Sequence, residues 1–123
     1  MQAFGLPKSN ETEKTTRSKA IQDATKYAID IPFKVMQVTY ESMQVIKAMA
    51  DIGNLNSISD AGVGALCARS AVMGAFMNVR INASGYDDKM YVQEIIAKGK
   101  EIEDKTIALE KEILQVVNEK IGV

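Results

Sequence analysis

Histidine and tryptophan are absent from the 123-residue chain, and Cys67 is its single cysteine. Without histidine there is no Ser-His-Asp triad, no imidazole base and no imidazole metal ligand. Any proton transfer must therefore use a carboxyl, lysine, tyrosine or thiol group, the backbone or water. One cysteine excludes an intramolecular disulfide and, with no histidine, a structural zinc site. We therefore expect no metal centre and a reducing, cytoplasmic compartment.

Net charge is also small: 15 basic and 16 acidic residues leave a formal charge of −1. Lysine and arginine do not cluster, so the phosphate-binding field that nucleic acid requires is not expected. Residues 61–79 approach the length of a membrane span, but Arg69 lies at their centre. Inserting such a charge costs about 2.5–3.5 kcal/mol, and small side chains offset little of it. No membrane partner is therefore expected.

Strand patterns are missing, and helical periodicity covers most of the chain, which predicts one all-α domain spanning residues 1–123. Ser9 or Asn10 can cap the first helix, and Pro32 disfavours helical geometry at Ile31, so this helix is expected to stop or kink there. The expected helices cover residues 10–31, 33–52, 60–82 and 88–120. The prediction is a bundle of about four long antiparallel helices.

Two apolar rows run along residues 33–52. The first row is Val35, Val38, Val45, Met49 and Ile52, which we expect to face the core. The second row is Met36, Met43, Ile46 and Ala50. A helix with two apolar rows is covered on most sides, by its own chain or by another. Self-association into a homodimer or a higher homo-oligomer is therefore predicted.

The helix expected over residues 60–82 is crowded with small side chains. On a helical wheel one narrow stripe contains Asp60, Gly64, Cys67, Ala71, Gly74, Ala75, Asn78 and Asn82. Each glycine costs about 1 kcal/mol against alanine in a helix, so a close approach is expected. The stripe suits either close helix packing or the wall of a crevice for a flat ligand. The pattern alone favours packing, with Cys67 as a small core residue.

Two segments, residues 53–65 (GNLNSISDAGVGA) and residues 78–82 (NVRIN), resemble one family. It is the cyclodeaminase domain of formiminotransferase-cyclodeaminase, together with the bacterial methenyltetrahydrofolate cyclohydrolases. Residues 1–8 and 28–32 are also similar to that family. The resemblance implies an all-α bundle that dimerises. Family members are longer at the N-terminus, where they carry a glycine-rich segment, so this chain looks like the C-terminal part of the domain.

The resemblance also implies chemistry on a tetrahydrofolate derivative as substrate. In the cyclodeaminase reaction, N10 of 5-formimino-tetrahydrofolate attacks the formimino carbon and ammonia leaves, giving 5,10-methenyl-tetrahydrofolate. In the cyclohydrolase reaction, water attacks the methenyl carbon and the ring opens to 10-formyl-tetrahydrofolate. The sequence does not separate the two reactions. The alternative is a non-catalytic helical oligomerisation module, or an inactive fragment of such an enzyme.

Asp60 is the candidate catalytic residue under this resemblance. A carboxylate near the cationic methenyl bridge stabilises it, and a carboxyl group whose pKa is raised by burial can move a proton. The alternative is that Asp60 only caps its helix. Substrate contacts are expected from Asn54, Asn56, Ser57, Ser59, Asn78, Arg80 and Asn82. The asparagines suit a pterin edge, and Arg80 suits a glutamyl carboxylate or an internal ion pair.

Overall fold

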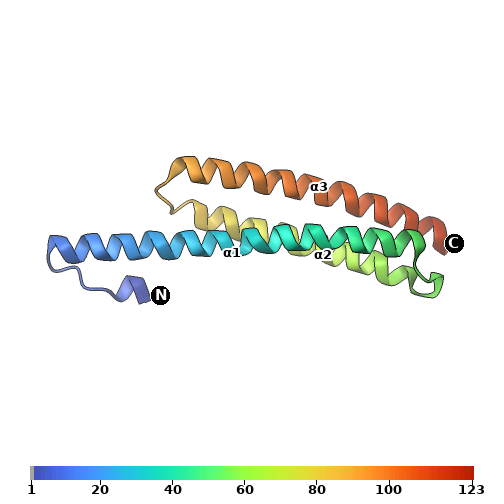
Figure 1. Cartoon of the computed structure of the whole chain (residues 1–123), viewed down its shortest axis with the longest axis horizontal. Coiled ribbons are helices and arrows are strands. Elements are labelled where there is room, and N and C mark those ends of the chain that lie inside the picture. Colours follow the sequence, from blue (N-terminus) through green and yellow to red (C-terminus); the bar gives the residue numbers. More distant parts are fainter. Residues whose placement is uncertain (1) are drawn as a thin grey trace.

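The computed structural model describes residues 2–123 and contains three long α-helices in an up-down-up arrangement (Figure 1). The elements are η1 (Gln2–Gly5), α1 (Glu11–Ile52), η2 (Leu55–Ser57), α2 (Ile58–Ala83) and α3 (Lys89–Ile121). Residues 2–123 contain no strand, so the all-α prediction is confirmed. The long helices number three, and the prediction of about four was wrong.

The difference lies at Pro32, because α1 runs through this residue without ending. A proline inside a helix has no N–H to donate to the carbonyl four residues earlier, which here is the carbonyl of Ala28. The side-chain amide of Asn82 on α2 donates to that carbonyl at 3.0 Å. The acceptor that Pro32 leaves without a helical donor is therefore satisfied by another helix. The prediction of a stop or kink at Ile31 did not include this long-range hydrogen bond.

α1 packs against α2 along most of the length of α2, and α3 contacts both helices. In Figure 1 the first turns of α1 extend beyond the ends of α2 and α3. Two hydrophobic clusters make up the core. One contains Ile29, Met36, Val72, Ala75, Phe76, Val79, Ala83 and Ile95. The other contains Met43, Ala50, Ile58, Ala61, Ala65, Ala68, Ile113 and Val117. Small residues of α2 thus occupy the centre of the bundle.

In the structure the second apolar row of α1 is the buried one, and the first row is exposed. Met36, Met43 and Ala50 of the second row are fully buried. The whole first row is exposed, with 50% of Val38 and 65% of Val45 accessible. The prediction that the first row faces the core was therefore wrong. Both rows are equally apolar, so periodicity could not show which one meets the rest of the chain.

Close backbone approach occurs between α2 and α3. A methyl group added at Gly99 would overlap the ring of Phe76, and one added at Gly62 would lie 3.2 Å from Val117. By contrast, a methyl group at Gly74 would meet nothing within 4 Å, and one at Gly64 would make an ordinary 3.5 Å contact with Ile46. The small-residue stripe is therefore not used for tight packing within this chain.

By length and composition alone, the segment Leu55–Ala83 is able to cross a membrane. In this structure the segment supplies the central helix of the bundle, where Ala65, Val72 and Val79 are fully buried. Arg69 on the same helix forms an ion pair with the buried Glu110 of α3 at 2.8 Å. These features suit the core helix of a bundle, and the absence of a membrane partner stays a prediction.

Candidate functional site

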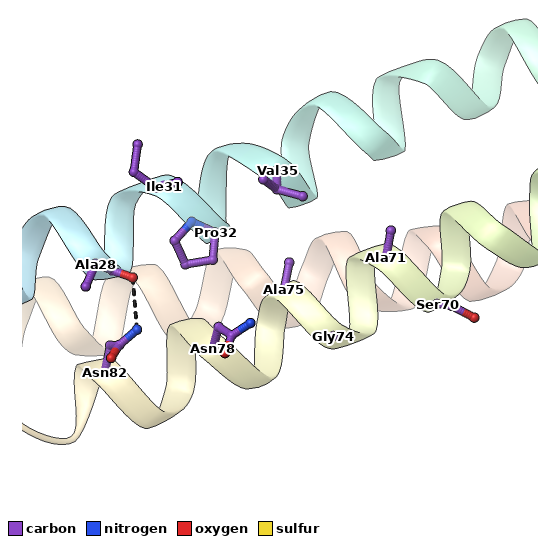
Figure 2. A pocket seen from close by; sticks show the side chains of 10 residues that line it. All are labelled: Ala28, Ile31, Pro32, Val35, Ser70, Ala71, Gly74, Ala75, Asn78 and Asn82. Carbon is purple, nitrogen blue, oxygen red and sulfur yellow. Dashed lines mark hydrogen bonds between the residues drawn. The ribbon is translucent and has the colours of Figure 1, made fainter.

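The face on which α1 and α2 meet, on the side away from α3, contains two hollows. The first hollow has a volume of about 520 Å³. Its lining residues are Ala28, Ile31, Pro32, Val35, Ser70, Ala71, Gly74, Ala75, Asn78 and Asn82. Figure 2 shows Pro32 and Val35 on one wall, Gly74 and Asn78 on the other, and α3 behind both helices. The wall contributed by α2 contains the second half of the small-residue stripe, from Ala71 to Asn82.

Asn82 and Asn78 are the amide side chains of this first hollow. Asn82 is half-buried and donates one N–H to the Ala28 carbonyl, as the dashed line in Figure 2 shows. This bond fixes the orientation of its amide. Asn78 lies one turn earlier on α2 and is exposed. The two predicted contacts are therefore close to each other, and one of them also has a structural role.

The second hollow lies at the other end of the same face and has a volume of about 370 Å³. Its lining residues are Val45, Ile46, Met49, Gly53, Asn54, Ser57, Asp60 and Ala61. Three of the predicted site residues thus meet here: Asp60, Asn54 and Ser57. The walls from α1 are apolar, and the polar groups come from the connection between α1 and α2 and from the first turn of α2.

Local hydrogen bonding explains the shape of this connection. Asn54 caps the short helix η2, accepting a hydrogen bond from the Asn56 backbone N–H at 3.0 Å. Ser57 is the N-cap residue of α2, but its side chain makes no capping hydrogen bond. Asp60 follows three residues later in the first turn of α2. The interpretation of Asp60 as the N-cap of its helix was therefore wrong.

Asp60 is exposed in this structure, so its own chain supplies none of the burial expected for a proton-transfer group. Its position in the first turn places the carboxylate beside the positive end of the α2 dipole. A carboxylate above an apolar wall suits electrostatic stabilisation of a cation. Covering the hollow would strengthen that interaction, because removing water lowers the local dielectric constant.

The remaining predicted residues lie apart from these groups. Arg80 is exposed, with its guanidinium carbon 5.0 Å from the centre of the Phe76 ring, and it lines a separate shallow hollow. Asn56 and Ser59 are exposed and line neither of the two hollows described above. Along α2, Asp60 and Asn78 are separated by about 27 Å at 1.5 Å per residue. The predicted contacts therefore fall into two groups that cannot touch one small ring.

Cys67 of the small-residue stripe was predicted as a core residue, and this prediction was wrong. The side chain is exposed. The reason is that most of the stripe faces the outer groove between α1 and α2, and Ala75 is its buried member. Among residues 2–123, no group of three Cys, Asp or Glu side chains is placed to hold a metal ion. The expected absence of a metal stays a prediction.

Sequence reasoning missed a polar cluster that joins α1 to α3. Lys26 forms an ion pair with Asp30 at 2.8 Å, and its ammonium lies 4.6 Å from the centre of the Tyr91 ring. The Tyr91 hydroxyl donates to the other carboxylate oxygen of Asp30. Burial alone would raise the pKa of Asp30, but the hydrogen bonds from Lys26 and Tyr91 outweigh it and lower that pKa. The only signal in the sequence was the family-like segment at residues 28–32.

Comparison with known proteins agrees with these features. Residues 1–101 match the family model described as formiminotransferase-cyclodeaminase. A methenyltetrahydrofolate cyclohydrolase from Methylorubrum extorquens is 37% identical over 122 residues, which are 99% of this chain and 59% of that protein. Formimidoyltransferase-cyclodeaminases from Gallus gallus and Mus musculus are 35% and 29% identical over 94 residues, which are 76% of this chain and 17% of each relative.

The chain thus spans less than two thirds of the length of each of these relatives. The family model nevertheless covers most of the chain, including both segments that carried the resemblance, residues 53–65 and 78–82. The predicted relationship is confirmed, and the chain belongs to the formiminotransferase-cyclodeaminase family.

Proposed function

We propose that this chain supplies part of the active site of an enzyme that acts on the one-carbon unit of a tetrahydrofolate. The family membership supports this proposal, as does the name of the bacterial relative, a methenyltetrahydrofolate cyclohydrolase. The observation that carries it is the second hollow, where Asp60 lies at the N-terminal end of α2 beside Asn54 and Ser57. An acidic group over an apolar wall fits a flat, cationic substrate centre.

In this proposal Asp60 acts at the one-carbon centre. In either reaction a nucleophile, N10 or water, adds to a carbon bound to nitrogen, and a tetrahedral intermediate forms. The Asp60 carboxylate stabilises the cationic methenyl bridge and accepts or returns the proton that moves to or from nitrogen. Asn54 and Ser57 orient the substrate through their amide and hydroxyl groups.

The first hollow then contacts a different part of the ligand. Its asparagines lie about 27–33 Å from Asp60 along α2 at 1.5 Å per residue, so they do not reach the reacting ring. We assign Asn78 to the distal part of the folate or its glutamyl chain, with Asn82 holding the wall of the hollow in place. We assign Arg80, Asn56 and Ser59 to the periphery of the ligand, because they line neither hollow.

Cytoplasmic location and the absence of nucleic-acid and membrane partners are part of the same proposal. They are supported by the single cysteine and by a net charge of −1 with both signs interspersed. A non-catalytic oligomerisation module is the second candidate, and the exposed apolar row of α1 favours it. The names of the relatives favour the enzyme.

Two assays separate these candidates. The chain is tested alone and mixed with the portion of the bacterial cyclohydrolase that lies outside the match. Hydrolysis of 5,10-methenyl-tetrahydrofolate is followed by absorbance, and ammonia release from 5-formimino-tetrahydrofolate by a coupled assay. The proposal expects one of the two activities, at least in the mixture. Binding to the added portion with neither activity would support the oligomerisation module instead.

A further inference from the structure

The last turn of α1 ends in backbone carbonyl groups that the helix itself does not satisfy. In an α-helix the last four carbonyl groups have no donor within the helix. α1 ends at Ile52, and the Gly53 N–H donates to the Met49 carbonyl at 2.9 Å. The last turn also contains no basic residue. The carbonyl groups of Ala50 and Asp51 therefore need donors from another part of the chain.

Lys120, in the last turn of α3, supplies these donors. Its ammonium nitrogen lies 2.6 Å from the Ala50 carbonyl oxygen and 2.5 Å from the Asp51 carbonyl oxygen. Lys47 of α1 donates instead to the Asp51 carboxylate. A cation at the C-terminal end of a helix is also favoured by the helix dipole. In Figure 1 the C-terminal end of α3 lies beside the connection between α1 and α2, so α1 is capped by another helix.

Apolar packing brings Lys120 to this position. Ile113, Val117 and Lys120 follow one another at steps of four and three residues, so they lie on one face of α3. Ile113 and Val117 belong to the same core cluster as Ala50 of α1. Gly62, early in α2, lies so close to Val117 that an added methyl group would be 3.2 Å from it. This face of α3 therefore holds the end of α1 and the beginning of α2 together, behind the second hollow.

We infer that Lys120 is a positioning residue for the second hollow. By fixing the end of α1, it sets the place of the connection that carries Asn54 and Ser57 and of the apolar wall near Asp60. Lys120 follows residues 1–101, which match the family model, so that match assigns it no role. The effect of Lys120 on turnover rests on the proposed function, whereas its effect on the connection does not.

The connection is too short to absorb a movement of α1. Only residues 53–57 separate the end of α1 from the beginning of α2. Met49 and Gly53 flank the carbonyl groups that Lys120 binds, and both line the second hollow. A displacement of the end of α1 therefore moves the wall relative to Asp60. A misplacement of about 1 Å is enough to lower turnover by roughly 100-fold.

Lys120→Met tests the link between α3 and the connection, because methionine keeps an unbranched apolar stem and removes the donors. The N–H groups of Asn56 and Ser57 donate to the side-chain and backbone oxygens of Asn54 at 3.0 Å and 2.9 Å. Their hydrogen exchange should be at least about fivefold faster in the variant. Amides of an exposed connection exchange by local opening, so a general loss of stability leaves their rates unchanged.

Two further variants show whether the donors of Lys120 are responsible. Lys120→Arg keeps a cation with several N–H donors, so it should restore slow exchange at Asn56 and Ser57. Lys111→Met, at an exposed position on the same helix, is the matched control and should exchange like the original chain.

Turnover tests the consequence for the proposed reaction. In the mixture of this chain with the remaining portion of the bacterial cyclohydrolase, Lys120→Met should lower kcat by about tenfold and raise KM by about threefold, because the orienting groups and Asp60 both move. A mere loss of folded chain would lower kcat and leave KM unchanged. Lys120→Arg should recover most of both effects, and Lys111→Met should equal the original chain.

Unchanged exchange at Asn56 and Ser57 in Lys120→Met would overturn the inference. Values of kcat and KM equal to those of Lys111→Met would also overturn it. If the original chain shows neither activity in the mixture, the proposed function fails, and faster exchange in Lys120→Met still supports the positioning of the connection by Lys120.

Discussion

The Asn82 amide lies 3.0 Å from the Ala28 carbonyl, the acceptor that Pro32 leaves without its donor inside α1. Pro32 thus leaves one backbone acceptor on α1 without its helical donor. Asn82, 54 positions away from Ala28 in the sequence, donates to that acceptor. The bond joins α1 to α2 at the edge of the first hollow. Asn82→Ala should therefore destabilise the fold by about 1–2 kcal/mol, because it leaves a partly buried carbonyl without a partner. Urea unfolding measures this loss.

Pro32→Ala tests whether Asn82 stabilises the fold because Pro32 leaves the Ala28 carbonyl without a helical donor. It restores the N–H that bonds Ala28, so Asn82→Ala should cost markedly less in the Pro32→Ala background. Asn78→Ala, an exposed asparagine one turn away, is the control and should change stability by less than about 0.5 kcal/mol. Equal losses from Asn82→Ala in both backgrounds would show that Pro32 and Asn82 are not coupled through this carbonyl.

Thr106 is fully buried on α3, and its hydroxyl has no hydrogen-bond partner among residues 2–123. Thr106→Val removes the unsatisfied group at nearly constant volume, so the free energy of unfolding should rise by about 1 kcal/mol. Thr25→Val is the contrasting variant, because the Thr25 hydroxyl donates to the Ile21 carbonyl at 2.8 Å. Thermal unfolding of both variants measures these changes in stability. A lower melting temperature for Thr106→Val would indicate a buried water or another partner for the hydroxyl.

Gly99 allows the Phe76 ring to lie against the α3 backbone, since an added methyl group would overlap two of its ring carbons. Gly99→Ala should destabilise the fold by about 1–3 kcal/mol through overpacking, despite the better helix propensity of alanine. A smaller residue opposite should relieve the strain, so Phe76→Leu should cost less in the Gly99→Ala background. Chemical unfolding of the two single variants and the double variant gives this coupling. Additive losses would argue against the close contact.

The cluster of Lys26, Asp30 and Tyr91 should make stability depend on pH at alkaline values. The hydrogen bond to Asp30 raises the pKa of Lys26 above its usual 10.5. Burial and then the bond to Asp30 raise the pKa of Tyr91 above its usual 10.0, with smaller effects from the charges of Tyr86 and Glu94. Groups whose pKa is raised on folding stabilise fully below their unfolded pKa, and this stabilisation is lost as pH rises through the folded value.

Stability should therefore fall above pH 10, and Tyr91→Phe should reduce that fall. Tyr91→Phe should also cost about 1 kcal/mol at pH 7, where the hydrogen bond to Asp30 is lost. Unfolding in urea at pH 7 and at pH 11 measures both effects. On the acid side, the lowered pKa of Asp30 adds stability above its usual 3.8, which is lost as pH falls through the folded value. An identical alkaline loss in both proteins would exclude Tyr91 as a contributor.

The sequence predicted the ends of the two later helices closely, because residues near those ends determine where each helix begins and ends. The predicted ranges 60–82 and 88–120 compare with Ile58–Ala83 and Lys89–Ile121. Asp88 caps α3 through the Tyr91 N–H, which is a local signal. The continuation of α1 through Pro32 depends on Asn82, and no local pattern contains that information.

The sequence predicted only part of the candidate site, because only part of it is formed by residues close together in the sequence. Asp60, Asn54 and Ser57 are neighbours in the sequence and lie together in the second hollow. The apolar walls from α1, such as Val45 and Met49, were predicted to face the core, because an exposed apolar row and a buried one have the same periodicity. Only the packing of α2 against α1 shows which row remains open.

If Asp60 acts on the one-carbon centre, its carboxylate must be essential for turnover, and Asp60→Asn tests this. The variant keeps the size of the side chain but removes the charge and the proton acceptor. Asp23→Asn, at an exposed carboxylate on α1, is the control. In the active mixture of this chain with the remaining portion of the cyclohydrolase, Asp60→Asn should lower turnover by roughly 100-fold or more, with folate affinity and melting temperature nearly unchanged. Turnover equal to that of Asp23→Asn would show that Asp60 does not act on the one-carbon centre.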